Sequence, residues 1–110
     1  MSEEIIFTII LHAGNARAEA YEALTAARAG DFEKAAGHLA QAENEAAAAH
    51  RVQADIIQRE AAGEKQDMSL LFVHAQDHLM TAIAEKSLIS HMVEMEKTIR
   101  DLTSRLEAKK

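Results

Sequence analysis

The near absence of helix-breaking residues constrains this chain more than any other feature of its sequence. It contains no proline and only four glycines in 110 residues. Proline removes a backbone hydrogen-bond donor and glycine loses more conformational entropy on folding, so both weaken helices. The rest of the chain is rich in strong helix formers, including 23 alanines, which lose little side-chain freedom in a helix. The sequence therefore predicts an all-α fold.

The size and charge of the chain exclude several classes of protein. Its length fits one domain over residues 1–110. It has no cysteine, which excludes disulfides and thiolate metal sites and suits a reducing compartment. The apolar runs are too short to span a membrane, and the acidic start Met1-Ser2-Glu3-Glu4 is unlike a signal peptide. The net charge of −6 disfavours nucleic acid and anionic lipid. We expect a cytoplasmic protein without direct membrane insertion.

Two short breaks divide the sequence into three helices. Gly30 can end one helix in the left-handed conformation, and Asp31 can cap the next. Gly63 can end the second helix, and Asp67 or Ser69 can cap the third. These signals predict helices at about 3–29, 31–62 and 68–107. Because the connections are short, successive helices should be antiparallel neighbours.

The first two predicted helices each carry a seven-residue pattern of mostly small apolar residues. Small side chains allow two helices to approach closely. The pattern predicts that one face of each helix is buried, with Gln53 interrupting the second face. The residues on these faces are Ile6, Ile9, Ala13, Ala16, Ala20, Ala23 and Ala27, and then Phe32, Ala35, Leu39, Ala42, Ala46, Ala49 and Ile56.

The third predicted helix differs from the others in its length and in its apolar pattern. About 40 residues make a rod of roughly 60 Å, whereas a compact domain of this size has a radius of gyration of about 13 Å. Large apolar residues recur at strict four-three spacing, which is typical of a coiled coil. We call this row the seam: Leu88, Met92, Met95, Ile99, Leu102 and Leu106. A second apolar edge contains Met80, Ile83, Ala84, Ile89 and Val93. The length of this helix predicts either that part of it projects beyond the bundle or that the subunit is elongated. The seam predicts a homo-oligomer, whose order the pattern leaves open.

The four-three spacing of the seam continues towards the start of the helix, but there the residues are polar. Going backwards from Leu88, it passes Glu85, Thr81, His78 and His74. His74 and His78 lie one turn apart. Asp77 lies about 60° round the helix from His74, so the three side chains share an arc of roughly 100°. Gln76 lies off this arc. Imidazoles and a carboxylate are costly to bury at an interface without a role.

Three interpretations of this polar patch remain open from spacing alone. Neutral imidazole is a good nucleophile near pH 7, so His74 could carry a phosphoryl group as a reactive phosphoramidate. Histidines one turn apart also suit a zinc ion, although the metalloprotease motif is absent because Ala75 follows His74. The third interpretation is a structural patch. For the scattered histidines a structural role is the better prediction: His12, His38, His50 and His91.

The segment from Val73 to Thr81, with the sequence Val-His-Ala-Gln-Asp-His-Leu-Met-Thr, resembles the active-site signature of a known family. This family is the lactose/cellobiose-type IIA component of the bacterial phosphoenolpyruvate-dependent sugar phosphotransferase system. The resemblance covers nearly the whole chain in order. Further segments that resemble the family are 13–17 (AGNAR), 30–32 (GDF), 49–53 (AHRVQ) and 60–64 (EAAGE). Asn15 departs from the pattern, because Asp is common there, and this departure puts nothing central in doubt.

The resemblance implies a phosphotransferase component with a phosphohistidine intermediate. His74 matches the histidine that accepts a phosphoryl group from the carrier protein HPr and passes it to a cysteine of the IIB component. The sugar is phosphorylated as it crosses the membrane through the IIC component. The resemblance also implies a homotrimer in which the third helices pack round the axis as a coiled-coil bundle.

The resemblance also divides the polar patch into separate roles. His78 and Gln76 match polar residues around the phosphorylated histidine. Asp77 matches an aspartate that faces its symmetry mates near the trimer axis and binds a divalent cation. Three converging carboxylates repel one another unless they are protonated or bridged by metal, and Mg²⁺ prefers such oxygen ligands. We therefore expect Mg²⁺ at Asp77.

Two other functions compete with a sugar-specific phosphocarrier. Histidine phosphotransfer domains of two-component signalling are usually four-helix bundles with Lys and Gly soon after the histidine, whereas this chain has Leu79 and Met80 there and three predicted helices. A structural coiled-coil adaptor would show no phosphorylation and would tolerate His74→Ala. The sequence leaves the sugar open among the lactose, cellobiose and chitobiose classes.

Overall fold

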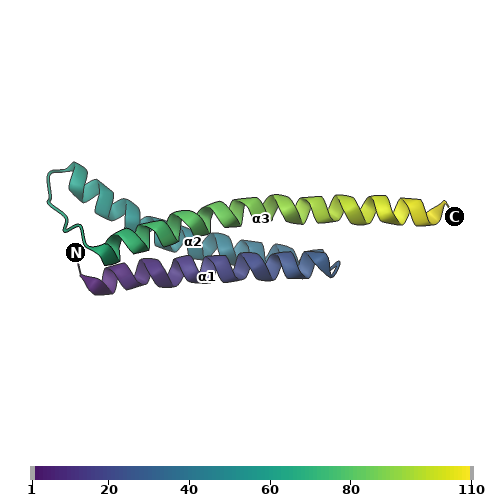
Figure 1. Cartoon of the computed structure of the whole chain (residues 1–110), viewed down its shortest axis with the longest axis horizontal. Coiled ribbons are helices and arrows are strands. Elements are labelled where there is room, and N and C mark those ends of the chain that lie inside the picture. The colour runs from purple at the N-terminus through teal and green to yellow at the C-terminus, as the bar shows by residue number, and fades with distance from the viewer. Residues whose placement is uncertain (1, 110) are drawn as a thin grey trace.

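The computed structural model describes residues 2–109, which form three helices joined by two connections (Figure 1). These are α1 (Glu3–Arg28), α2 (Phe32–Ala61) and α3 (Leu70–Ala108). Helix α2 runs antiparallel to α1, and α3 returns parallel to α1. The all-α fold of three long helices is confirmed, and each helix boundary falls within about two residues of its prediction.

Each helix begins at a side chain that accepts a hydrogen bond from its first turn. Ser2 caps α1, Asp31 caps α2 and Ser69 caps α3. Each cap satisfies a backbone N–H that has no partner inside the helix. Gly30 and Gly63 follow the ends of α1 and α2 with φ of 85° and 97°, a conformation that a side chain would strain. The breaks predicted from these two glycines are therefore real helix ends.

The core lies between the small-residue faces of α1 and α2 and one face of α3. All seven residues predicted for the buried face of α1 are buried. In α2 the four alanines predicted for the buried face and Ile56 are buried, whereas Phe32 and Leu39 are only partly covered at the bundle surface. The buried residues of α3 are Phe72, Ala75, Leu79, Ala82, Ile89 and Val93. This face of α3 is separate from the seam.

The subunit is elongated, as the length of the third helix predicts. Its extents are 67 × 21 × 20 Å and its radius of gyration is 18.2 Å. The last turns of α3 continue past the turn that joins α1 to α2 (Figure 1). Arg100 of α3 reaches this turn and donates a hydrogen bond to the carbonyl oxygen of Arg28, at 2.6 Å. All described residues after Arg100 are exposed.

The seam of α3 is exposed along its whole length in the single subunit. The exposed fraction of its six residues runs from 43% for Met92 to 68% for Leu106. A continuous row of exposed Leu, Met and Ile is typical of a surface through which proteins associate. Among residues 2–109, none of the three helices combines the length and apolarity needed to cross a membrane.

Two histidines tie α1 to α2 through hydrogen bonds to glutamates at the bundle surface. His12 Nδ1 lies 2.5 Å from Glu45 Oε2, and His38 Nδ1 lies 2.6 Å from Glu19 Oε2. The hydrogen bond from His12 lowers the pKa of the Glu45 carboxyl below its ordinary value of 4.5. These contacts agree with the structural role predicted for His12 and His38.

We expect His12→Ala to raise the pKa of Glu45 and to lower the melting temperature at pH about 5.5. A carboxyl whose pKa is lowered by folding stabilises the fold above its unfolded pKa, and this contribution is lost as the pH falls through the folded pKa. The difference in melting temperature between the wild type and the variant should therefore shrink at pH about 3. Thermal melts at both pH values test this, with His50→Ala as the control. A difference that does not change with pH would contradict it.

Candidate functional site

His74 and His78 project from the first half of α3, in the part of the helix that lies beside α1. Their rings are stacked, with centroids 6.0 Å apart and an interplanar angle of 10°. His74 is exposed, whereas His78 is partly buried against α1. The one-turn spacing thus brings the two imidazoles together, with His74 as the ring that a partner molecule can reach.

Arg17 of α1 connects three polar residues of α3. Its Nε donates to Glu85 Oε2 at 2.5 Å, its Nη2 donates to Thr81 Oγ1 at 2.6 Å, and its Nη1 lies 3.2 Å from His78 Nδ1. The hydroxyl of Thr81 also donates to the carbonyl oxygen of Asp77, at 2.9 Å. Because a guanidinium can only donate, Nδ1 of His78 must accept, and the proton of the neutral ring then lies on Nε2.

The surroundings of His78 favour its uncharged form. Burial of the ring lowers the pKa of His78, and the positive charge of Arg17 and the neighbouring His74 act in the same direction. The carboxylates of Asp77 and Glu85 raise this pKa, but less strongly. At neutral pH the site therefore pairs the accessible imidazole of His74 with a neutral imidazole that carries one N–H donor.

Gln76 lies on a different side of α3 from the two histidines, as its position off the arc predicts. Its Oε1 accepts a hydrogen bond from Nε2 of Gln53 on α2, at 3.0 Å. Nε2 of Gln53 also lies 3.8 Å from the sulfur of Met80. Gln53, which interrupts the apolar face of α2, is therefore a buried amide with a partner. Within one subunit, the side-chain bond of Gln76 fixes α2 against α3.

Asp77 is exposed and lies in line with the seam. Met95 follows Asp77 by 18 positions, which is about five helical turns, so both side chains leave α3 in nearly the same direction. Within the described residues of one subunit, no three His, Cys, Asp or Glu side chains are grouped to hold a metal ion. A cation at Asp77 would therefore need ligands from other subunits or from water.

The contacts of Arg17, Glu85 and Thr81 were not predicted from the sequence. The sequence did contain a signal for Glu85 and Thr81, because they continue the four-three spacing of the seam towards the histidines. Arg17 carried a weaker one, as a charged residue beside the buried row of α1. The spacing of residues along the sequence does not show how α1 and α3 pack. Their parallel packing places Arg17 next to His78, some sixty residues away in the sequence.

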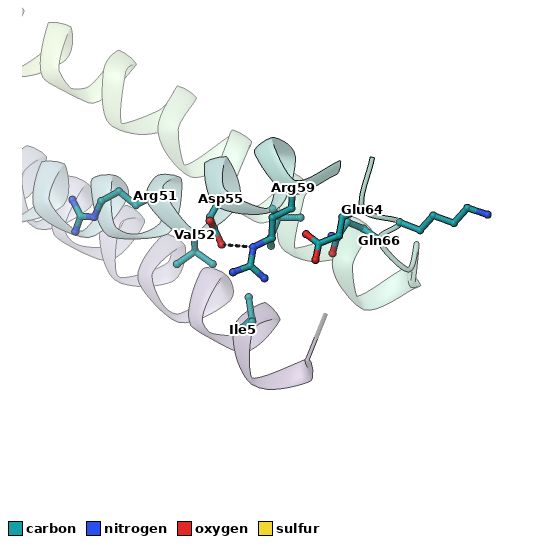
Figure 2. A pocket seen from close by; sticks show the side chains of 9 residues that line it. Ile5, Arg51, Val52, Asp55, Arg59, Glu64 and Gln66 are labelled. Carbon is teal, nitrogen blue, oxygen red and sulfur yellow. Dashed lines mark ion pairs between the residues drawn. The ribbon is translucent and has the colours of Figure 1, made fainter. Parts of the chain in front are cut away.

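A separate hollow of about 460 Å³ lies at the C-terminal end of α2, and Figure 2 shows the side chains that line it. Ile5, Val52 and Ile56 contribute apolar surface. Arg59 forms an ion pair with Asp55, with 3.2 Å between Nε and Oδ2, and its guanidinium extends towards Ile5. None of the four predicted site residues, His74, Gln76, Asp77 and His78, lines this hollow.

Comparison with known proteins identifies the family of the chain. The model of the family described as "PTS system, Lactose/Cellobiose specific IIA subunit" matches residues 4–97. The chain belongs to this family. The lichenan-specific phosphotransferase enzyme IIA component of Bacillus subtilis (strain 168) is 48% identical over 99 residues, which are 90% of each chain. The sequence-based assignment is therefore confirmed.

Two solved structures of IIA components have the same fold. The cellobiose-specific enzyme IIA from Bacillus anthracis superposes with a TM-score of 0.88 at 41% identity, covering 92% of this chain and 94% of that one. The chitobiose IIA of Escherichia coli, solved in complex with HPr, superposes with a TM-score of 0.78 at 37% identity, covering 89% and 95%.

The IIA component described here is thus a phosphocarrier of the lactose, cellobiose and chitobiose group, and a phosphotransferase component of a sugar permease. This assignment rules out the two-component phosphotransfer domain and the structural adaptor as the function of the chain.

Proposed function

We propose that His74 is the residue that carries the phosphoryl group. The observation that carries this proposal is the pairing of an exposed imidazole at His74 with a neighbouring His78 whose Nδ1 is held by Arg17. An accessible nucleophile beside a fixed N–H donor is what transfer of a phosphoryl group needs, because catalysis of this step is mainly positioning and charge stabilisation.

The transfer step keeps the number of bonds to phosphorus constant. The lone pair of a ring nitrogen of His74 forms the new N–P bond as the N–P bond of the donor phosphohistidine breaks, and that electron pair stays on the donor imidazole. His78 can donate a hydrogen bond from Nε2 to a phosphoryl oxygen and so offset its negative charge. In the onward step a cysteine thiolate attacks phosphorus and the electron pair returns to His74.

The partners follow from the family and from the chitobiose relative, which has been solved with HPr. The donor is the phosphohistidine of HPr, and the acceptor is the cysteine of the IIB component. The IIC permease is an indirect partner, and all of these steps take place at the cytoplasmic side of the membrane.

Incubation with phosphoenolpyruvate, enzyme I and HPr tests the proposal. Acid-labile phosphate on the chain is expected, and its absence would contradict the phosphocarrier role.

A homotrimer is the assembly that we propose, with three copies of α3 packed round one axis. The exposed seam supports this arrangement, since six large apolar residues per subunit lie on one side of α3 and outside its own core. The described residues of α3 beyond Arg100 are all exposed within one subunit. Packing against two further copies would bury this row as knobs in holes.

Asp77 then faces the axis, and we propose that it binds a divalent cation there, with Mg²⁺ as the best candidate. Its alignment with Met95 supports this position. One carboxylate from each of three subunits, completed by water, is a donor set that suits Mg²⁺. The cation would offset the repulsion between the carboxylates and would take no part in the transfer step.

We expect Asp77→Leu to retain the trimer and to raise its melting temperature by a few degrees, because it removes the repulsion between carboxylates and extends the apolar row. Thermal melts with and without Mg²⁺ measure this, and the variant should lose any dependence on the cation. Asp101→Leu, which changes an exposed aspartate away from the seam, is the matched control. Collapse of Asp77→Leu to a monomer would count against the assignment of Asp77 to the axis.

A further inference from the structure

Two residues of α1 face the two nitrogens of His78. Arg17 approaches Nδ1, at 3.2 Å. Gly14, one turn earlier on α1, faces Nε2, because a Cβ atom built at Gly14 would lie 3.5 Å from that nitrogen. Among the residues that the structure describes, none forms a hydrogen bond with Nε2 of His78. Of the two nitrogens of the imidazole, Nδ1 is therefore engaged by Arg17, and Nε2 faces Gly14 without a hydrogen-bond partner among the described residues.

We propose that Arg17 and Gly14 are positioning residues for phosphoryl transfer: Arg17 fixes the tautomer of His78 with the proton on Nε2, and Gly14 keeps that N–H uncovered for a phosphoryl oxygen. This inference rests on the proposed function of His74. It extends the site from one segment of α3 to a pair of helices, with α1 deciding which nitrogen of His78 serves the reaction.

The guanidinium of Arg17 is well placed to hold the tautomer. Its Nε is occupied by Glu85 and its Nη2 by Thr81, so Nη1 is left to point at His78. Because the Thr81 hydroxyl donates its proton to the Asp77 carbonyl, it is free to accept from Arg17. A ring proton on Nδ1 would face an N–H of the guanidinium, which cannot accept it. The opposite tautomer is therefore disfavoured.

Gly14 has no side chain, and this leaves the space beside Nε2 of His78 free of a methyl group. It lies within α1 and has ordinary helical backbone angles, so no turn requires a glycine there. An alanine methyl at 3.5 Å from Nε2 would be in ordinary van der Waals contact, so Gly14→Ala should fold. That methyl would nevertheless cover the edge of the ring that carries the N–H. A glycine in a helix interior is usually less stable than alanine, so the expected gain from Gly14→Ala is in stability and the expected loss is in transfer.

The tautomer can be measured directly, before any phosphate is added. Nitrogen-15 NMR correlations at a pH of about 8, where imidazoles are neutral, distinguish a proton on Nε2 from one on Nδ1. We expect His78 of the wild type to carry its proton on Nε2. Arg17→Gln should populate the Nδ1-protonated form, whereas Arg51→Gln, a change of an exposed arginine on α2, should not. A wild-type His78 protonated on Nδ1, or an unchanged tautomer in Arg17→Gln, would overturn the role of Arg17.

The variant Gly14→Ala leaves every contact of Arg17 in place. It therefore tests the other side of the His78 ring independently of Arg17. Gly14→Ala and Gly37→Ala both place alanine inside a helix, and nothing lies within 4 Å of the added methyl at Gly37. We expect both variants to melt at or above the wild-type temperature. Only Gly14→Ala should slow single-turnover transfer from phospho-HPr, by about tenfold to a hundredfold. Equal rates for the two variants would overturn the role of Gly14.

The wild type in the same transfer assay separates this inference from the function on which it rests. Lack of label on the wild type would overturn the proposed function itself. A labelled wild type whose His78 is protonated on Nδ1, or whose rate is unaffected by Gly14→Ala, would overturn the positioning roles alone and leave His74 as the phosphoryl carrier.

Discussion

His74→Gln is expected to reduce phosphoryl uptake from phospho-HPr to background, a loss of at least about a thousandfold. Glutamine has a similar reach but no nucleophilic ring nitrogen, so the N–P bond cannot form. The fold should survive, because His74 is exposed and contributes nothing to the core. Incorporation of label from radioactive phosphoenolpyruvate, together with circular dichroism of the variant, measures both parts of the prediction.

Two further histidine variants serve as a control and as a comparison for His74→Gln. His91→Gln changes another exposed histidine of α3, one outside the site, and should leave uptake unchanged. His78→Gln should slow uptake by about a hundredfold, because it removes a positioned donor and leaves the nucleophile in place. If His78→Gln abolished uptake and His74→Gln did not, the two roles would have been assigned to the wrong residues.

Ile99→Asp is expected to convert the proposed trimer into monomers. The position lies in the middle of the apolar part of the seam, and an aspartate there would place three carboxylates in a dry interface. An unpaired buried charge costs about 3–5 kcal/mol, which corresponds to more than about a hundredfold in the association constant. Sedimentation velocity at several concentrations measures the change directly. The subunit should stay helical, because Ile99 is 53% exposed in it.

Ser104→Asp is the matched control for the seam. Ser104 is exposed on the same helix, about 140° round the axis from Ile99. The same charge on that side should leave the assembly intact. If both variants remained trimeric, or if the wild type sedimented as a monomer at all concentrations, the seam would not be the surface through which the subunits associate.

The sequence determined most of this fold because its signals are local. Gly30, Gly63 and the capping residues place the helix ends, and alanine-rich faces specify which sides of α1 and α2 meet. The length of α3 predicted an elongated subunit without any tertiary information. Phe32 and Leu39 were placed on a buried face but are only partly covered, because pattern does not locate the edge of a bundle.

The site could be predicted only in part, for a physical reason. His74, Asp77 and His78 share an arc of one helix, so helical spacing brings them together. The contact between Arg17 and His78 depends on the register of α1 against α3, which periodicity leaves free. The same holds for Gln53 and Gln76, whose hydrogen bond joins α2 to α3. In the sequence, Gln53 stands out only as an interruption of the apolar face of α2. The packing of α2 against α3 explains how this buried amide finds a partner.

The most direct test of the account is to identify the residue that holds the phosphate. The wild-type chain is phosphorylated by phosphoenolpyruvate, enzyme I and HPr, and is then digested with trypsin at alkaline pH, where phosphohistidine survives. The tryptic peptide 66–86 contains both candidate histidines, so it must be fragmented by electron transfer to separate them. We predict one phosphate per chain, on His74. Phosphate on His78, or on a residue outside this peptide, would contradict the account.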